Sequence, residues 1–204
     1  YSIQPDTHEA LGKTYDGFKY KLSEMMEEEN KTIYFDFQNA QGSASEQVSF
    51  IESFVNKKPD IIYAIATAAA NTAAQKTAGP GINVIFNAVT DPTLESAKIV
   101  EDWNAPGANV TGVSDMNPVA KQLQVMKLLM GNREKFKIGV LYTTSEPNSI
   151  TQYDMLAEEC IQQGIIENKE EIVVKTITNA SDISSAIFSS FKDEGVEIVY
   201  IPTD

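Results

Sequence analysis

The chain has very few of the residues on which most catalytic and metal sites depend. Its 204 residues include one histidine, one cysteine and one arginine. A Ser-His-Asp or Cys-His arrangement needs a histidine, and His8, near the start of the chain, is interpreted as a solvated residue at a helix start. One histidine and one cysteine are too few for a metal cluster, and Cys160 falls on the apolar stripe of a predicted helix, where packing is its expected role. We therefore predict a protein that is not an enzyme, with no metal site and no cofactor.

Basic charge and long apolar runs are scarce as well. The 16 lysine and arginine residues face 29 aspartate and glutamate residues, which gives a formal net charge of −13 at pH 7. Nucleic acid needs a basic surface, so it is excluded as a partner, and an anionic membrane would repel the chain. Neither the P-loop motif nor the glycine-rich dinucleotide motif is present. No run of eighteen apolar residues exists, so no segment is predicted to span a bilayer. Tyr1 and Asp204 both look like cut ends of a longer chain, and a targeting signal ahead of Tyr1 would be out of view.

What the chain does contain is a regular alternation of strand and helix patterns. Strands are predicted at 32–37, 61–66, 82–88, 109–113, 137–143, 171–177 and 196–201. Helices are predicted at 8–29, 44–57, 68–78, 117–131, 149–163 and 182–194. Strands such as 82–86 and 137–142 are apolar on both faces, as in parallel sheets that helices cover on both sides. The predicted fold class is α/β, with doubly wound parallel sheets.

Two of these strands have similar amino-acid sequences. Asp60–Thr67 reads DIIYAIAT and Val196–Thr203 reads VEIVYIPT, and each follows a helix pattern and an earlier β-branched or aromatic run. A strand–helix–strand unit that occurs twice predicts two similar lobes. Open parallel sheets bind ligands beyond the carboxyl ends of their strands. We therefore expect two lobes that face a cleft, with Thr67 and Thr203 on opposite walls.

The boundary between the lobes is placed near Asp115–Pro118. A predicted strand ends there, and Asn117-Pro118 is interpreted as a helix cap followed by a first-turn proline. The N-terminal lobe would then be 1–115 and the C-terminal lobe 116–204, with both lobes incomplete.

Small, hydroxyl-bearing or acidic residues follow the predicted strands, at the starts of helices. A helix N-terminus offers unpaired N–H groups and a partial positive charge that suit a carboxylate. Hydroxyls add donors, while Asp91, Asp115 and Asp204 would suit an ammonium group. A free amino acid satisfies both sets of groups. The alternative is that these residues are only helix caps and turn formers, which Ser, Thr and Asp often are.

Five motifs in order carry a resemblance over essentially the whole chain. They are Phe37–Gly42 (FQNAQG), Ala64–Thr67 (AIAT), Ala88–Pro92 (AVTDP), Pro106–Asp115 (PGANVTGVSD) and Tyr200–Asp204 (YIPTD). The chain resembles the ABC-transporter substrate-binding family that includes the TrpX-type proteins. The resemblance implies a type I periplasmic-binding-protein fold whose two lobes close over a small molecule and deliver it to a membrane permease.

The same resemblance implies the remaining functional expectations. The ligand would be an amino acid, and an aromatic one is expected because family members with an assigned ligand bind aromatic amino acids in particular. The partner would be an ABC permease, the protein a monomer, and its location extracytoplasmic, either lipid-anchored at the cell surface or periplasmic. The strand-end residues that match the family's ligand contacts are Thr67, Ala68, Thr90, Asp91, Asp115, Glu146, Asn148, Ser149 and Asp204. Most of the family's first strand and everything after Asp204 would be missing.

A second class remains open: a ligand-sensing effector domain of a regulator or receptor on the same fold. A signal peptide with a lipobox cysteine ahead of Tyr1 would indicate transport, and a helix-turn-helix would indicate regulation.

Arginine usage refines the ligand argument. Arg133 lies in a turn away from the strand ends, so a bidentate arginine clamp on the ligand's carboxylate is not available in this chain. We predict that the Thr67-Ala68 turn takes the carboxylate through hydroxyl and helix N–H groups. Asp204 occupies the position in the second copy of the repeat that Ala68 holds in the first, and we predict that it binds the ammonium group.

Overall fold

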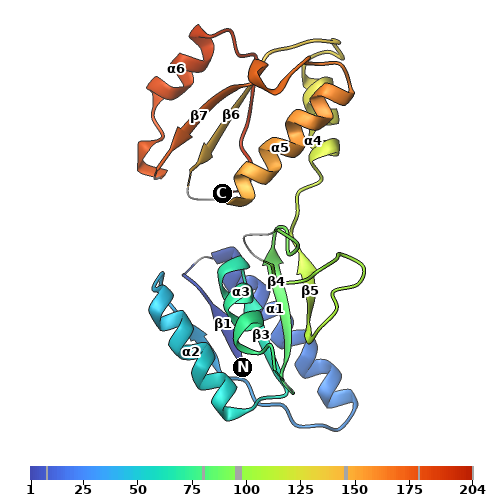
Figure 1. Cartoon of the computed structure of the whole chain (residues 1–204), viewed down its shortest axis with the longest axis vertical. Helices are drawn as coiled ribbons and strands as arrows, with labels where there is room; N and C mark the ends of the chain where they lie inside the picture. Colours follow the sequence, from blue (N-terminus) through green and yellow to red (C-terminus); the bar gives the residue numbers. More distant parts are fainter. Residues whose placement is uncertain (8, 80, 95–97, 145–146, 179, 204) are drawn as a thin grey trace. The chain divides into compact units, whose positions relative to one another are not determined.

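The chain divides into two compact units, each with its own sheet and its own core (Figure 1). Unit 1 is Tyr1–Met116 and unit 2 is Asn117–Asp204. The computed structural model describes residues 1–7, 9–79, 81–94, 98–144, 147–178 and 180–203. None of the helices in this described part combines the length and the apolar character of a membrane span.

Unit 1 is built on a five-stranded sheet in which every pairing is parallel, with the order β2-β1-β3-β4-β5. Its strands are β1 (Ser2–Gln4), β2 (Phe37–Asn39), β3 (Ile61–Ile65), β4 (Asn83–Val89) and β5 (Val110–Ser114). Its helices are α1 (Glu9–Glu28), α2 (Ala44–Lys57) and α3 (Thr67–Lys76). Helices cover both faces of the sheet, because side chains along each strand point alternately to one face and the other.

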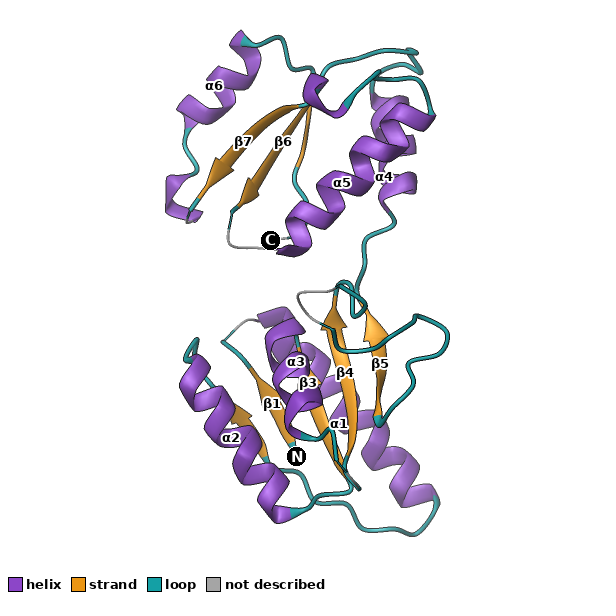
Figure 2. Ribbon diagram, in the orientation of Figure 1, coloured by secondary structure: helices purple, strands orange, loops and turns teal. Residues whose placement is uncertain are grey.

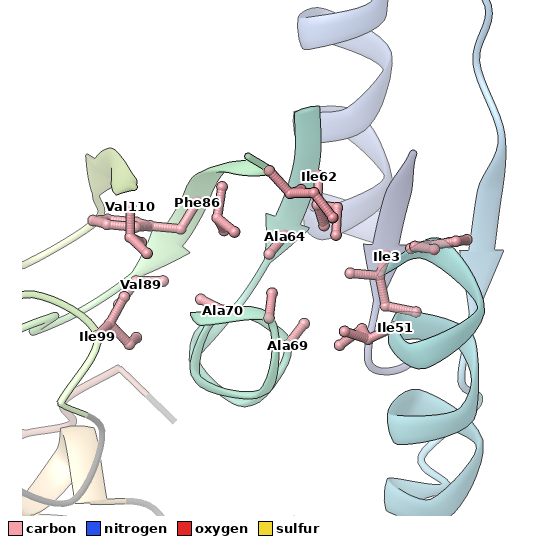
Figure 3. Packing of buried hydrophobic residues seen from close by; sticks show 14 of the residues in the cluster. Ile3, Ile51, Ile62, Ala64, Ala69, Ala70, Phe86, Val89, Ile99 and Val110 are labelled. Carbon is pink, nitrogen blue, oxygen red and sulfur yellow. The ribbon is translucent and has the colours of Figure 1, made fainter. Parts of the chain in front are cut away.

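One face of this sheet packs on α2 and α3. Ile3 and Ala64 on adjacent strands lie on the same side as Ile51 of α2 and Ala69 and Ala70 of α3, and all five are fully buried (Figure 3). The small alanine side chains allow the backbone of α3 to approach the sheet closely. Its first turn is therefore held directly at the carboxyl end of β3.

The other face packs on α1. Tyr63 stacks on Phe18 of α1 with ring centroids 3.8 Å apart, and its hydroxyl donates to the carbonyl of Thr14. The N-terminal half of α1 is thereby fixed against the sheet.

Unit 2 has a three-stranded sheet, again with parallel pairings only, in the order β7-β6-β8 (Figure 2). Its strands are β6 (Ile138–Thr143), β7 (Val173–Ile177) and β8 (Ile198–Tyr200). Its α-helices are α4 (Val119–Leu129), α5 (Pro147–Gln162) and α6 (Ser185–Asp193).

Helices cover both faces of the second sheet too. Val140 and Tyr200 belong to a core with α4 and α5, whereas Leu141 packs with Phe191 of α6. A Cβ atom on Gly139 would lie 2.7 Å from the ring of Phe191, so only glycine lets α6 pack at this distance. The prediction of an α/β fold with doubly wound parallel sheets is confirmed.

The first three strands of each unit share one arrangement. In unit 1 the first strand, β1, lies between the second and the third, and in unit 2 β6 lies between β7 and β8. Ala64 pairs with Ile3 across β3 and β1, and Tyr200 pairs with Val140 across β8 and β6. Ala64 and Tyr200 are equivalent positions of the two similar strand sequences. The repeat that the sequence predicts is therefore present in the topology.

The predicted strand over 32–37 is wrong in position. The structure assigns no strand to 32–36, and β2 begins only at Phe37. A strand requires a partner, and β1 offers three residues that pair with Phe37–Asn39. Tyr34, in the preceding segment, is 88% exposed, so its aromatic character marks a surface residue rather than a buried strand.

Candidate functional site

Five of the predicted ligand residues lie at one edge of unit 1. β3, β4 and β5 are neighbours in a parallel sheet, so their carboxyl ends share an edge. Thr67 and Ala68 follow β3, Thr90 and Asp91 follow β4, and Asp115 follows β5. This is the edge at which open parallel sheets bind ligands.

The N-terminus of α3 has no side-chain cap among the described residues. Its N-cap residue is Ala66, with φ 70° and ψ 160°. The first helical hydrogen bond runs from Ala70 N to Ala66 O (3.0 Å), so the N–H groups of Thr67, Ala68 and Ala69 precede it. Such N–H groups, together with the helix dipole, form an anion-binding site.

The conformation of Ala66 is one that residues other than glycine rarely adopt, and it costs of the order of 1–3 kcal/mol. Its N–H donates to the carbonyl of Asn87 on β4 (2.9 Å), which helps to hold this turn. On the other side, Gln47 of α2 donates to Ala68 O (3.1 Å) and to the hydroxyl of Thr72 (2.9 Å). The start of α3 is therefore fixed from two neighbouring elements, while Ala68 remains exposed.

The ends of β4 and β5 are joined by hydrogen bonds. The Ser114 hydroxyl donates to Thr90 O (2.6 Å), and Thr90 is only 2% exposed. The carboxylate of Asp91 accepts from the N–H (2.9 Å) and the hydroxyl (2.6 Å) of Thr93, which is the geometry of an Asx turn. Asp91 thus organises its own loop with one oxygen. Asp115 is exposed, and its backbone N–H donates to Val89 O at 3.2 Å.

The corresponding edge of unit 2 brings together α5 and the end of β8. Asn148 and Ser149 lie in the first turn of α5, which follows β6. Ser149 is fully buried, and its hydroxyl donates to Thr203 O (2.7 Å). Asn148 is partly buried. The other two candidates, Glu146 and Asp204, lie outside the described residues.

Thr203 is surrounded by a group of polar side chains, which we name the Thr203 cluster: Asn117, Ser149, Gln152, Tyr200 and Thr203. The Asn117 amide donates to the Thr203 hydroxyl (2.6 Å) and to Gln152 Oε1 (2.9 Å). Gln152 Oε1 also accepts from Thr203 N (3.2 Å) and lies within reach of the Tyr200 hydroxyl (3.4 Å). Sequence reasoning did not identify Gln152 as part of this edge.

Asn117 corrects a local prediction. The pattern Asn117-Pro118 predicts a helix cap, but the N-cap residue of α4 is Pro118 and no side chain caps it among the described residues. The Asn117 side chain turns instead to the partners in unit 2 that bind its amide, Gln152 and Thr203. A cap motif cannot reveal partners that lie far away in the sequence.

Burial dominates the electrostatics of the Thr203 cluster. Desolvation raises the pKa of Tyr200 to about 12, and its hydroxyl also donates to Gln122 Oε1 (3.1 Å). Gln152 is fully buried, and its Nε2 has no hydrogen-bond partner among the described residues. The cluster is therefore a neutral, desolvated group at physiological pH.

Arg133 lies at the opposite edge of the unit 2 sheet. It pairs with Glu197 (2.7 Å), just before β6 and β8 begin. The pKa of the Glu197 carboxyl is lowered, first by the hydrogen bond from the N–H of Lys137 and then by Arg133. The chain's one arginine therefore does not reach the carboxyl edge of its own sheet. Within the described ranges there is also no group of three or more His, Cys, Asp or Glu residues suited to a metal ion.

Sequence comparison identifies the class to which this fold and these strand ends belong. The model of the family described as ABC transporter substrate binding protein matches residues 3–204. The chain belongs to that family, and the resemblance seen in its motifs is confirmed.

Individual relatives agree with this assignment. The tyrosine-binding protein of Clostridioides difficile (strain R20291) is 36% identical over 197 residues, which cover 97% of this chain and 53% of that protein. The crystal structure of an ABC domain in complex with L-Trp from Streptococcus pneumonia is 30% identical, with a TM-score of 0.74. The ligand-free, open structure of a substrate-binding protein with adhesive properties from Clostridium difficile is 33% identical, with a TM-score of 0.73. Both structural alignments cover 100% of this chain and 64% of the other, so the chain spans about half to two thirds of the length of these relatives.

Proposed function

We propose that this chain is the ligand-recognising part of an extracytoplasmic receptor that supplies an aromatic amino acid to an ABC importer. The observation that carries the proposal is the uncapped N-terminus of α3, which sits at the carboxyl edge of the unit 1 sheet beside Thr90, Asp91 and Asp115. Such a terminus suits a carboxylate, and the neighbouring acidic side chains suit an ammonium group. Relatives whose names specify tyrosine or whose structure holds L-Trp support the aromatic class.

The proposed contacts divide between the two units. The N–H groups of Thr67 and Ala68, with the Thr67 hydroxyl, take the ligand's carboxylate. Asp204, which follows the equivalent strand in unit 2, takes the ammonium group. Because no arginine serves these edges, the carboxylate is bound by neutral donors, which suits a zwitterion and disfavours a dicarboxylate or a phosphate ester.

The wider functional setting is part of the same proposal. The receptor acts as a binding protein rather than an enzyme, works as a monomer, and passes its ligand to a membrane permease. Its location is periplasmic or lipid-anchored at the outer surface of the cell. The family match favours this role over a ligand-sensing domain of a regulator, which would carry a DNA-binding segment ahead of Tyr1.

A screen of the twenty amino acids by thermal shift, with the full-length protein, tests the proposal. A ligand that binds only the native state raises the melting temperature. We expect the largest shifts with L-tyrosine, L-tryptophan and L-phenylalanine, and titration calorimetry then gives each dissociation constant. A protein that responds to a sugar or a nucleoside, and to none of these amino acids, would contradict it.

A further inference from the structure

Every polar atom of Thr203 takes part in a hydrogen bond. Its N–H donates to Gln152 Oε1 (3.2 Å), its carbonyl accepts from Ser149 Oγ (2.7 Å), and its hydroxyl accepts from Asn117 Nδ2 (2.6 Å). Ser149 and Gln152 lie one turn apart on α5 and are both fully buried. Thr203, which follows β8, therefore has its position set by Ser149 and Gln152 of α5 and by Asn117.

Asn117 connects this cluster to the segment that joins the units. It is the first residue of unit 2, directly after Met116. On the unit 1 side, Ser114 Oγ donates to Thr90 O (2.6 Å) and accepts from Met116 N (2.9 Å). We name Ser114–Asn117 the joining segment. Its first residue, Ser114, is hydrogen-bonded to Thr90, which follows β4, and its last residue, Asn117, is hydrogen-bonded to Thr203, which follows β8.

Gln152 is the residue on which the unit 2 end of this arrangement depends. Its Oε1 accepts from Asn117, from Thr203 N and from the Thr203 hydroxyl (3.3 Å), whereas its buried Nε2 has no partner among the described residues. An unpaired buried donor is unfavourable, so a residue chosen only for stability would not carry one. The amide orientation follows from these partners, because the opposite orientation would direct Nε2 at two N–H donors, the Asn117 amide and the Thr203 backbone.

We propose that Gln152 is a positioning residue for ligand binding. Through its amide oxygen it keeps Thr203 and Asn117 in one rigid group, so that the strand end in unit 2 and the joining segment move together when the ligand binds. The inference rests on the proposed function, because it assigns Gln152 an effect on the affinity for the amino acid. It adds a residue that does not touch the ligand.

Four variants of the full-length protein separate this role from simple packing. Gln152→Met keeps the length of the side chain and removes the acceptor, whereas Gln152→Glu keeps an acceptor oxygen in a carboxyl group that burial favours in its neutral form. Gln162→Met is the matched control, because Gln162 lies on the same helix but is exposed. Asn117→Ala is a milder second test if Gln152→Met does not fold.

Two measurements are made on each variant, below its melting temperature. Titration calorimetry with L-tyrosine and L-tryptophan gives the affinity. We expect a loss of about tenfold for Gln152→Met, equivalent to one buried hydrogen bond, a smaller loss for Gln152→Glu, and none for the control. Hydrogen exchange at the Thr203 amide in the ligand-free protein should become faster in Gln152→Met and Asn117→Ala only.

The outcomes distinguish the two levels of the argument. If the wild type binds no amino acid, the proposed function fails, and unchanged exchange at Thr203 would separately overturn the positioning of Thr203 by Gln152. If the wild type binds and Gln152→Met binds equally well with only a lower melting temperature, the cluster is structural and the inference is rejected. Recovery of affinity in Gln152→Glu, with the exchange rate restored, supports it.

Discussion

A threonine follows the third strand of each unit, Thr67 after β3 and Thr203 after β8, and the polar groups of these two threonines are used differently. After β3 the chain enters α3 directly, and the Thr67 hydroxyl makes no hydrogen bond with the described residues. After β8, Thr203 is bound at its N–H, its carbonyl and its hydroxyl. The two units therefore share the order of their strands, but they differ in which polar groups after the third strand remain available to a ligand.

This difference has a physical consequence for the two ends. Within the described part of the chain, the end in unit 1 keeps N–H groups and a hydroxyl without partners, and the backbone at Ala66 is strained. The end in unit 2 uses the polar atoms of Thr203 for hydrogen bonds within the unit. We infer that one end binds the ligand through its backbone and the other presents a side chain from a fixed support.

The largest effect is expected for Asp204→Ala, which removes the carboxylate that we propose binds the ligand's ammonium group. Loss of one partner of a buried charged pair costs about 2–5 kcal/mol, which lowers the affinity for the amino acid by roughly 30-fold to several thousand-fold. Calorimetry on the full-length protein measures this. An unchanged dissociation constant with a melting temperature lowered by a few degrees would make Asp204 a helix cap instead.

The next largest effect is expected for Thr203→Val, and it should appear in stability. The substitution leaves Asn117 with one partner fewer inside the Thr203 cluster, which costs about 1–3 kcal/mol of the free energy of unfolding. Denaturant unfolding measures it, and Thr203→Ser, which keeps the hydroxyl, is the control. A loss below about 0.5 kcal/mol would show that the cluster contributes little.

Thr67→Val tests the equivalent position in unit 1 and should give the reverse pattern. Because the Thr67 hydroxyl has no partner among the described residues, stability should change by less than about 0.5 kcal/mol. The affinity for L-tyrosine or L-tryptophan should fall by roughly fivefold, the equivalent of about 1 kcal/mol. Equal losses of stability in Thr67→Val and Thr203→Val would remove the contrast between the two ends.

The smallest effect concerns pH and Tyr200. Below pH 10 the phenol is protonated in both the folded and the unfolded state. Between about pH 10 and 12 the unfolded state releases its proton while the buried group, with a pKa of about 12, retains it, so the free energy of unfolding falls in that window. Tyr200→Phe should remove this part of the decline. Urea unfolding at pH 8, 10 and 11 compares the two proteins, and parallel curves would contradict the prediction.

The fold was predictable because it depends on local patterns. The order of apolar and polar residues in the segments 44–57 and 61–66 predicts α2 and β3 almost to the residue. The strand over 32–37 failed because strand formation depends on a partner, and β1 pairs only with the last of these residues and the two that follow.

The candidate site was predictable only in part, for the same reason. Strand ends can be located from the sequence, so Thr67 and Thr90 were found by position alone. The contacts of Asn117 with Gln152 and Thr203 join residues 35 and 86 positions apart, and no spacing rule reports such pairs. The sequence alone does not distinguish an amide side chain that is buried in a helix from one that is exposed.

Cys160 gives unit 2 an internal reporter. Its side chain lies on α5, fully buried in the core that α5 shares with α4 and the unit 2 sheet, and burial raises the pKa of the thiol to about 12. Thiol reagents attack the thiolate, so at neutral pH the group is both inaccessible and protonated. The rate at which a thiol reagent labels Cys160, followed by peptide mapping, therefore measures the rate of opening of the second unit alone and does not report on the first.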